Sequence, residues 1–426
     1  MTQPRDKTWF GQPRGLTILF LTNMWELFSY FGMRTMLVYY MTKQLFFAQE
    51  KASLIYGSYV AAAYFTPLLG GIAADRWLGK RRAVIIGGSI MALGHFLMTF
   101  EALFYFALIT IALGNGLFLP SLPSQINDLY AADDPRRGRA YNVYYVGLNL
   151  GAFLAPFVCG TLGERYGWHY GFGAAGLGML SGLVIYLCGQ KYLPRETPRA
   201  DPVIPAKVEN RDQGGRTWLL LLGVGIAVTV FRGAYEQIGN TIPLWTDISV
   251  DRSLGHFVIP MTWFQSLNPL LVITLTPLLL FYWRRRTAAT GREISARRKM
   301  AIGALIVAGA YLLLCLVASS AGANRATWPW LVLFSVILTL GELYILPTGL
   351  GLFAKLAPRR LGATTVASWF LTIFSGSMLA GAVGTLWSRT SHSGFFFILS
   401  LFAAVAAVLL WLLDLMGRRP GKEKFA

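Results

Sequence analysis

Twelve apolar runs, each about 20 residues or longer, constrain this chain most, because a helix of that length spans the hydrocarbon core of a bilayer. The chain has 426 residues, of which 55% are hydrophobic and 14% are charged, and this composition is typical of a polytopic membrane protein. We therefore predict an all-α membrane protein with twelve transmembrane helices. The runs cover residues 15–42, 53–75, 83–101, 103–127, 139–163, 169–190, 217–238, 256–283, 300–320, 328–354, 361–387 and 393–416.

The basic residues lie on alternate sides of these runs. Thirty of the 38 Lys and Arg residues fall in the two termini and in the loops after every second run. By the positive-inside rule this face is cytoplasmic, so we expect both termini inside and an even number of helices. The net charge of +18 then reflects topology and contact with anionic lipid, and nucleic-acid binding is not expected.

One long polar stretch divides the runs into two sets of six. Residues 191–216 contain prolines and many charges, so we predict two bundles, residues 1–190 and 217–426, joined by a cytoplasmic linker. Two six-helix halves related by a repeat are the architecture of the major facilitator superfamily, whose substrate site lies at mid-membrane between the halves. Short patterns recur at equivalent runs: Thr66-Pro67-Leu68-Leu69 as Thr276-Pro277-Leu278-Leu279, Leu119-Pro120-Ser121 as Leu346-Pro347-Thr348, and His169-Tyr170-Gly171-Phe172 as His392-Ser393-Gly394-Phe395.

The apolar runs contain ionisable residues, and the most informative five are Glu26, Arg34, Arg232, Glu236 and Glu342. A charge at membrane depth costs roughly 2.5 to 3.5 kcal/mol even on lenient insertion scales, so these residues indicate a polar route through the protein. Arg232 and Glu236 are four residues apart and share a helix face, so they can pair. The alternative is that the five charges only neutralise one another in a static core.

The turn between the second and third runs closely resembles the loop signature of the major facilitator superfamily. Its glycines allow close helix packing, and the resemblance implies that Asp75 and Arg76 gate the protein without touching substrate. The alternative is a simple positive-inside turn. The segment reads Gly70-Gly71-Ile72-Ala73-Ala74-Asp75-Arg76-Trp77-Leu78-Gly79-Lys80-Arg81-Arg82.

Four further segments, together with that turn, resemble the proton-coupled oligopeptide transporters, the peptide transporter family of the superfamily. Members often carry two extra helices between the halves, which residues 191–216 cannot supply, so the resemblance implies a twelve-helix version. The segments are Tyr144-Tyr145-Val146-Gly147-Leu148-Asn149-Leu150-Gly151-Ala152, Tyr166-Gly167-Trp168-His169-Tyr170-Gly171-Phe172-Gly173, Trp263-Phe264-Gln265-Ser266-Leu267-Asn268-Pro269, and Gly341-Glu342-Leu343 through Lys355-Leu356-Ala357-Pro358 to Trp369-Phe370-Leu371.

The chain departs from the family pattern at four positions. Asn23 and Leu27 replace the Glu and Arg of the helix 1 motif, Leu119 replaces the helix 4 lysine, and Arg232 occurs where an aromatic residue is usual. The usual network for proton coupling is therefore incomplete. Glu26 and Glu236 are the remaining candidates for the coupling acid, which must change its proton affinity between the two transport states.

The resemblance also implies a substrate pocket. Glu342 is similar to the family acid that receives the free amine of a peptide, and an arginine suits a carboxylate because its planar fork donates two parallel hydrogen bonds. For each aromatic or asparagine residue, a packing role is an equal alternative. The candidate substrate-binding residues are Tyr30, Arg34, Tyr64, Asn149, Arg232, Glu236, Asn268, Glu342 and Trp369.

The sequence shows no pattern of enzyme chemistry. It contains no phosphate-binding glycine loop and no nucleophile elbow, and its three cysteines are isolated without metal-ligand spacing. We therefore expect no enzyme activity, no cofactor and no metal.

Together these features predict a monomeric, multi-pass secondary transporter of a bacterial inner (plasma) membrane. It would import short peptides or peptide-like compounds with protons by alternating access. One alternative is a transporter of the same fold that carries another zwitterion or an anion as a facilitator or exporter, which Arg232 and the absent lysine favour. A second alternative is a transport-dead sensor or scaffold.

Overall fold

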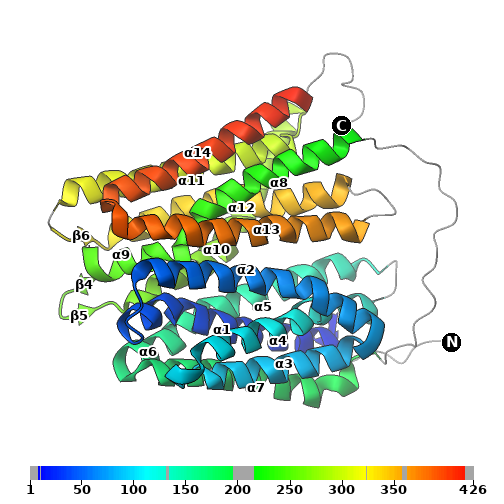
Figure 1. Cartoon of the computed structure of the whole chain (residues 1–426). Helices are drawn as coiled ribbons and strands as arrows, with labels where there is room; N and C mark the ends of the chain where they lie inside the picture. The colour runs from blue at the N-terminus through cyan, green and yellow to red at the C-terminus, as the bar shows by residue number, and fades with distance from the viewer. Residues whose placement is uncertain are drawn as a thin grey trace. The chain divides into compact units, whose positions relative to one another are not determined.

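The computed structural model describes residues 8–9, 11–130, 134–194, 215–322, 324–356 and 362–417, and these are almost entirely helical (Figure 1). The first seven α-helices are α1 (Arg14–Lys43), α2 (Gln49–Ala73), α3 (Lys80–Leu97), α4 (Phe104–Ser124), α5 (Arg136–Ala155), α6 (Thr161–Tyr166) and α7 (Trp168–Gly189). The next seven are α8 (Gly215–Tyr235), α9 (Thr241–Ser249), α10 (Leu267–Thr290), α11 (Ala296–Ala321), α12 (Pro329–Leu356), α13 (Gly362–Gly384) and α14 (His392–Gly417).

Short helical segments join or extend these helices. Two are π-helical, η1 (Ala74–Leu78) and η4 (Pro156–Gly160), and six are 3₁₀-helical. The 3₁₀ segments are η2 (Glu101–Leu103), η3 (Asn127–Leu129), η5 (Gln190–Tyr192), η6 (Glu236–Gly239), η7 (Met261–Ser266) and η8 (Thr385–Arg389).

Three two-residue strand pairs complete the described structure. Strands β1 (Thr8–Trp9) and β2 (Gln12–Pro13) are antiparallel, as are β4 (Ser253–Leu254) and β5 (Phe257–Val258). Strand β3 (Val250–Asp251) pairs in parallel with β6 (Ala326–Thr327).

Each of the twelve predicted runs falls on helical structure, as an all-α membrane protein requires. Within the described residues, ten continuous helical segments are long and apolar enough to cross a membrane. Helices α1 and α3 are not among them: α1 carries Glu26 and Arg34, and α3 has only 18 residues and begins with three basic ones. Helices thus lie at the twelve predicted positions, although α1 and α3 do not meet this requirement of length and apolar composition.

Two predicted runs differ from the structure in their bounds. The run at 217–238 continues as one helical segment to Ser249. The geometry changes from α-helical to 3₁₀ at Glu236, in η6, and is α-helical again in α9. The run at 256–283 begins in the β4–β5 hairpin, where Gly255 has a φ of 62°, and its helical part starts at Met261. A positive φ is readily adopted by glycine, which explains the turn at this position.

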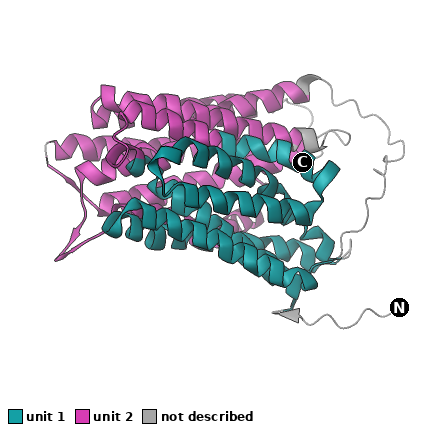
Figure 2. Cartoon of the chain, turned by 60° about the horizontal axis from the view of Figure 1, so that its bottom comes forward, with its two compact units in different colours: residues 1–40, 62–212 teal, residues 41–61, 213–426 magenta. Residues whose placement is uncertain are grey.

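The contacts between Cα atoms divide the chain into two units (Figure 2). The first unit comprises residues 1–40 and 62–212, and the second comprises residues 41–61 and 213–426. The end of α1 and the first half of α2 thus group with the second unit, whereas the sequence places them in a 1–190 bundle. Most of the predicted linker, residues 191–216, lies outside the described residues.

Apolar packing between neighbouring helices forms the core of each unit. In the first unit, α3 packs against α4 and α7, and a cluster that includes Leu19, Phe118, Met179 and Tyr186 is buried there. In the second unit, α11 packs against α12 and α14, and α8 packs against α13. Such close helix packing in lipid depends on shape complementarity, because lipid tails are as apolar as the side chains.

Residues 41–61 are joined to the rest of the second unit by a series of polar contacts. The Lys43 ammonium lies 2.7 Å from an Asp247 carboxylate oxygen, and the Arg389 guanidinium lies 2.9 Å from the Glu50 carboxylate. The Ser53 hydroxyl donates a hydrogen bond of 2.9 Å to the side-chain oxygen of Asn240, and both residues are fully buried. The network thus connects the end of α1 to α9, and the beginning of α2 to η8 and to the break before α9.

Helices α2 and α13 approach each other closely at Gly57 and Gly381. A Cβ atom added to Gly57 would lie 2.6 Å from the Cα of Gly381 and 2.7 Å from its nitrogen, closer than atoms can pack. We predict that Gly57→Ala destabilises the protein by roughly 1 to 3 kcal/mol, because the clash is with backbone that cannot rotate away. The measurement is the thermal unfolding midpoint of the purified protein in detergent.

The control is Gly309→Ala in α11, where nothing lies within 4 Å of the added atom. Because alanine is the better helix former, Gly309→Ala should match or exceed the wild-type midpoint. Equal midpoints for Gly57→Ala and Gly309→Ala would show that α2 and α13 are not packed as described.

Candidate functional site

The second unit holds a cluster of polar side chains around Glu342 on α12. The Asn268 side-chain amide on α10 donates a hydrogen bond of 2.6 Å to the Glu342 carboxylate, and the Tyr235 hydroxyl on α8 donates another. The same Asn268 amide lies 3.1 Å from the Thr339 hydroxyl, one turn before Glu342. Glu342 and Asn268 both remain partly exposed. The carboxylate is thus oriented by two donors and is still accessible to a third.

Arg232 and Glu236 form an ion pair beside this cluster. The pair joins the last turn of α8 to the first residue of η6, and the two side chains are only 3% and 2% exposed. Both residues interact electrostatically with Glu342. The predicted pairing is confirmed, and the structure brings three of the five ionisable residues together with a formal charge of −1.

The Arg232 side chain contacts a glycine of the neighbouring helix α13 and a tyrosine of its own helix. Gly376 on α13 faces the Arg232 side chain, and a Cβ atom at this glycine would lie 2.5 Å from the Cβ of Arg232. The guanidinium carbon lies 5.6 Å from the centre of the Tyr235 ring, which is within the range of a cation–π interaction. Tyr235 therefore contacts Arg232 and Glu342 at once.

Sequence reasoning missed Tyr235 as a member of this cluster. It lies three residues after Arg232, and residues three or four apart lie on one helix face, so its position beside Arg232 could have been inferred. Its hydrogen bond to Glu342 joins residues more than 100 positions apart, which no local pattern indicates.

The break at η6 is stabilised by Gln237 and Asn240. The Gln237 amide donates to the Ala380 carbonyl of α13 at 2.8 Å, and the Gln237 carbonyl oxygen accepts from Asn240 and from Thr241. All three residues are fully buried. These bonds replace helix hydrogen bonds where the geometry changes, which fixes the position of Glu236 at the break.

Trp369, the remaining predicted site residue of the second unit, has its described contacts on α12. It is 3% exposed and packs edge-on against Phe353 at a ring separation of 5.3 Å. A Cβ atom at Gly349 would lie 2.3 Å from its ring, so this glycine makes room for the indole. These contacts show that the Trp369 ring packs against α12.

The first unit holds the predicted residues of α1, which occur four residues apart along the helix. Glu26, Tyr30 and Arg34 are buried, with exposures of 1%, 7% and 9%. The guanidinium of Arg34 lies 5.6 Å from the centre of the Phe31 ring. One carboxylate oxygen of Glu26 has no hydrogen-bond partner among the described residues. Burial of a carboxylate oxygen without a partner is energetically costly.

The other predicted residues of the first unit lie on α2 and α5. Tyr64 is partly buried on α2. Asn149 is 5% exposed, and its amide donates a hydrogen bond of 2.9 Å to the Tyr145 carbonyl of its own helix. On α1, Asn23 contacts the Tyr144 carbonyl at 3.5 Å, so it uses its amide for helix packing where the family pattern has an acid.

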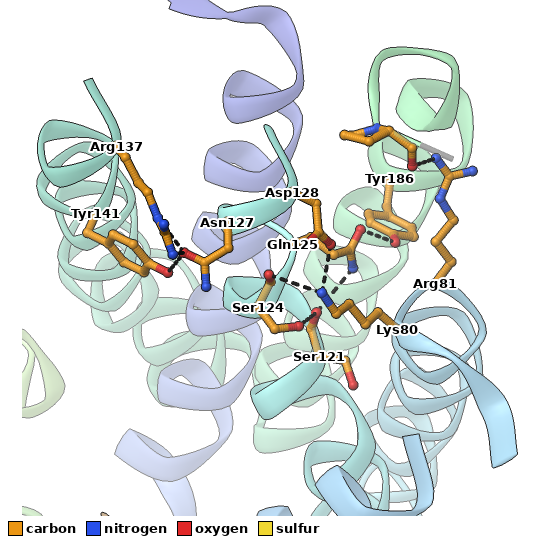
Figure 3. Close-up of polar contacts among 11 residues, drawn as sticks. Lys80, Arg81, Ser121, Ser124, Gln125, Asn127, Asp128, Arg137, Tyr141 and Tyr186 are labelled. Atoms are coloured by element: carbon orange, nitrogen blue, oxygen red, sulfur yellow. Dashed lines mark hydrogen bonds and ion pairs between the residues drawn. The ribbon is translucent and has the colours of Figure 1, made fainter. Parts of the chain in front are cut away.

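The predicted gating segment forms the π-helix η1, and its Asp75 and Arg76 are exposed. Gly79 ends this segment with a φ of 78°. The Lys80 ammonium then lies 2.7 Å from the Asp128 carboxylate and 3.4 Å from the Ser124 carbonyl (Figure 3). Asp128 lies in η3, beyond the end of α4, and sequence reasoning did not include it. The turn is thus tied to α4 through Lys80.

A second set of contacts surrounds this turn (Figure 3). The Arg81 guanidinium donates a hydrogen bond of 2.7 Å to the Leu193 carbonyl, and the Tyr186 hydroxyl donates to the Gln125 side chain at 2.9 Å. Arg137 donates to the Asn127 side chain at 2.9 and 2.6 Å. These bonds connect the ends of α3, α4, α5 and α7 in the first unit.

No group of three His, Cys, Asp or Glu side chains within the described residues is arranged to hold a metal ion. The three cysteines are free thiols.

Comparison with known proteins identifies the family. The sequence profile of the POT family matches residues 81–210 and 206–399. The chain is 30% identical to the uncharacterized transporter YclF of Bacillus subtilis (strain 168), covering 98% of this chain and 96% of that protein. It is 31% identical to the peptide transporter YePEPT of Yersinia enterocolitica subsp. palearctica serotype O:3 (strain YE-P4), covering 89% of each. The crystal structure of peptide transporter POT in complex with sulfate superposes with a TM-score of 0.89 at 27% identity, over 96% of both chains. The chain is thus a multi-pass membrane protein that belongs to the POT family.

Proposed function

We propose that this protein is a proton-coupled symporter that imports short peptides or peptide-like compounds by alternating access. The observation that carries the proposal is the Glu342 carboxylate, which Asn268 and Tyr235 orient and which is still partly exposed. A fixed carboxylate of this kind suits the free amine of a peptide through a charge-assisted hydrogen bond. The names of the relatives support the same substrate class.

Arginine side chains would receive the carboxylate of the substrate. Arg232 lies beside Glu342 and is held by Glu236, and the first unit offers Arg34 on α1. The other predicted pocket residues, Tyr30, Tyr64, Asn149 and Trp369, remain proposals, as does gating by Asp75 and Arg76.

Proton coupling is assigned to Glu236. When the carboxylate of the substrate takes over Arg232, Glu236 loses its charge partner and accepts a proton. Substrate and proton then bind cooperatively, and the coupling free energy is the same in both directions. Glu26 is the second candidate, because it is buried and one of its oxygens has no hydrogen-bond partner among the described residues.

The test is uptake of radiolabelled dialanine by cells that lack other peptide transporters. Expression of this protein should raise uptake, and unlabelled dipeptides and tripeptides should compete, whereas free alanine and N-acetyl-dialanine should compete weakly. Competition by anions or single zwitterions, with none by peptides, would favour a carrier of another zwitterion or anion. That candidate is supported by Arg232, which adds a cation where the family pattern has an aromatic residue.

The proposed topology places both termini and residues 191–216 in the cytoplasm. In a background without the native cysteines, Ser253→Cys in β4 should react with a membrane-impermeant maleimide added to intact cells. Ala288→Cys, at the exposed end of α10, should react only after the cells are permeabilised. Labelling of Ala288→Cys in intact cells would show that the protein has the opposite orientation.

A further inference from the structure

The second unit contains a cavity of about 300 Å³ at the ends of α9, α11 and α14, apart from the Glu342 cluster. Strands β3 and β6 pair beside it, with Val250 opposite Ala326. The volume lies at the lower end of the range for small-molecule sites. Its lining includes Trp245, Ser249, Asn324, Arg325 and His392.

Each polar side chain of this lining can donate a hydrogen bond. Arg325 is exposed and brings a guanidinium with five N–H donors. The Ser249 hydroxyl lies 3.2 Å from the Nδ1 atom of His392, and the His392 ring stacks on Trp387 at a centroid distance of 4.5 Å and an angle of 9°. Serine and histidine are thus held in place by each other and by the tryptophan.

The electrostatics favour an anion. His392 is the first residue of α14, a helix of 26 residues, so the positive end of the helix dipole points toward this end of the cavity. No Asp or Glu is among the residues that line it. The nearby acid is Asp251, whose pKa is held below its usual range by hydrogen bonds from Ser253 and by the Arg325 charge. Asp251 is exposed and does not line the cavity.

The remaining walls are apolar. Trp245 is 1% exposed and is held edge-on by Phe396, while Ala318 and Ala321 come from the last turns of α11. These apolar side chains can contact a methyl or short alkyl group of a bound molecule.

From this arrangement we infer that the cavity binds a small organic carboxylate, with Arg325 donating to its two oxygens and Ser249 and His392 completing the site. The planar fork of arginine matches the two oxygens of a carboxylate. The inference does not depend on the proposed peptide transport, because none of these residues belongs to the Glu342 cluster.

The test uses N-acetyl-L-alanine, a carboxylate without a free amine, and its neutral partner N-acetyl-L-alaninamide. Binding to the full-length protein in lipid nanodiscs is followed by saturation-transfer NMR titration. The acid should bind at least tenfold more tightly than the amide. Arg325→Gln should weaken binding of the acid by about tenfold or more, because a charge-assisted hydrogen bond is lost. His392→Phe, which keeps the ring on Trp387, should weaken it severalfold.

The matched control is Arg389→Gln, an arginine of the same unit that pairs with Glu50 and does not line the cavity. It should bind the acid like the wild type. Equal affinity of wild type and Arg325→Gln, or of acid and amide, would overturn the inference. If Arg325-dependent binding is found and no peptide is transported, only the proposed function fails.

Discussion

Replacing Glu342 with glutamine is expected to weaken binding of a zwitterionic dipeptide by about 10- to 100-fold, because a hydrogen bond to a charged group contributes roughly 1.5 to 3 kcal/mol. Glutamine keeps the shape of the side chain and its carbonyl can still accept from Asn268 and Tyr235, so the local structure should be preserved. The measurement is the concentration of dialanine that half-inhibits uptake of a labelled tracer into proteoliposomes.

The same experiment with N-acetyl-dialanine isolates the amine. This compound should bind weakly and equally to wild type and Glu342→Gln, because neither can use the missing ammonium. Glu50→Gln serves as the control, since this acid of the second unit pairs with exposed Arg389. If dialanine binds equally well to Glu342→Gln and to the wild type, Glu342 does not receive the amine.

Replacing Glu236 with glutamine is expected to abolish accumulation of dipeptide driven by a pH gradient while leaving counterflow. Counterflow exchanges labelled for unlabelled substrate and needs no net proton movement, so a protein without its coupling acid can still perform it. The assay compares both activities in proteoliposomes of the same protein content.

This variant removes the ion-pair partner of the buried Arg232 guanidinium, and breaking a buried pair in that way costs about 3 to 5 kcal/mol. The double variant Arg232→Gln with Glu236→Gln removes both charges and tests whether the loss is one of folding. Counterflow in Glu236→Gln shows that the variant is folded. If Glu236→Gln still accumulates dipeptide with only a pH gradient supplied, the coupling acid lies elsewhere, and Glu26→Gln is the next variant.

Hydropathy and charge spacing predict much of this fold because membrane helices are local structures. A run of apolar residues must satisfy its backbone hydrogen bonds within itself, so its position can be read without knowing its neighbours. The pairing of Arg232 with Glu236 is predictable for the same reason, since four residues make one helical turn.

Contacts between distant segments could not be read in this way. The grouping of residues 41–61 with the second unit depends on Ser53 meeting Asn240, which is 187 positions away. The change to 3₁₀ geometry at Glu236 likewise depends on Gln237 bonding to α13. The role of Lys80 as partner of Asp128 requires α3 and η3 to lie together. In each case a polar side chain finds its partner only after the helices have packed.

The most direct test of the account is accumulation of labelled dialanine by the purified wild-type protein in proteoliposomes with an acidic exterior. We predict that the internal concentration rises above the external one and returns to equilibrium when a protonophore collapses the gradient. Uptake that only equilibrates, and that is the same with and without the pH gradient, would contradict proton-coupled peptide transport.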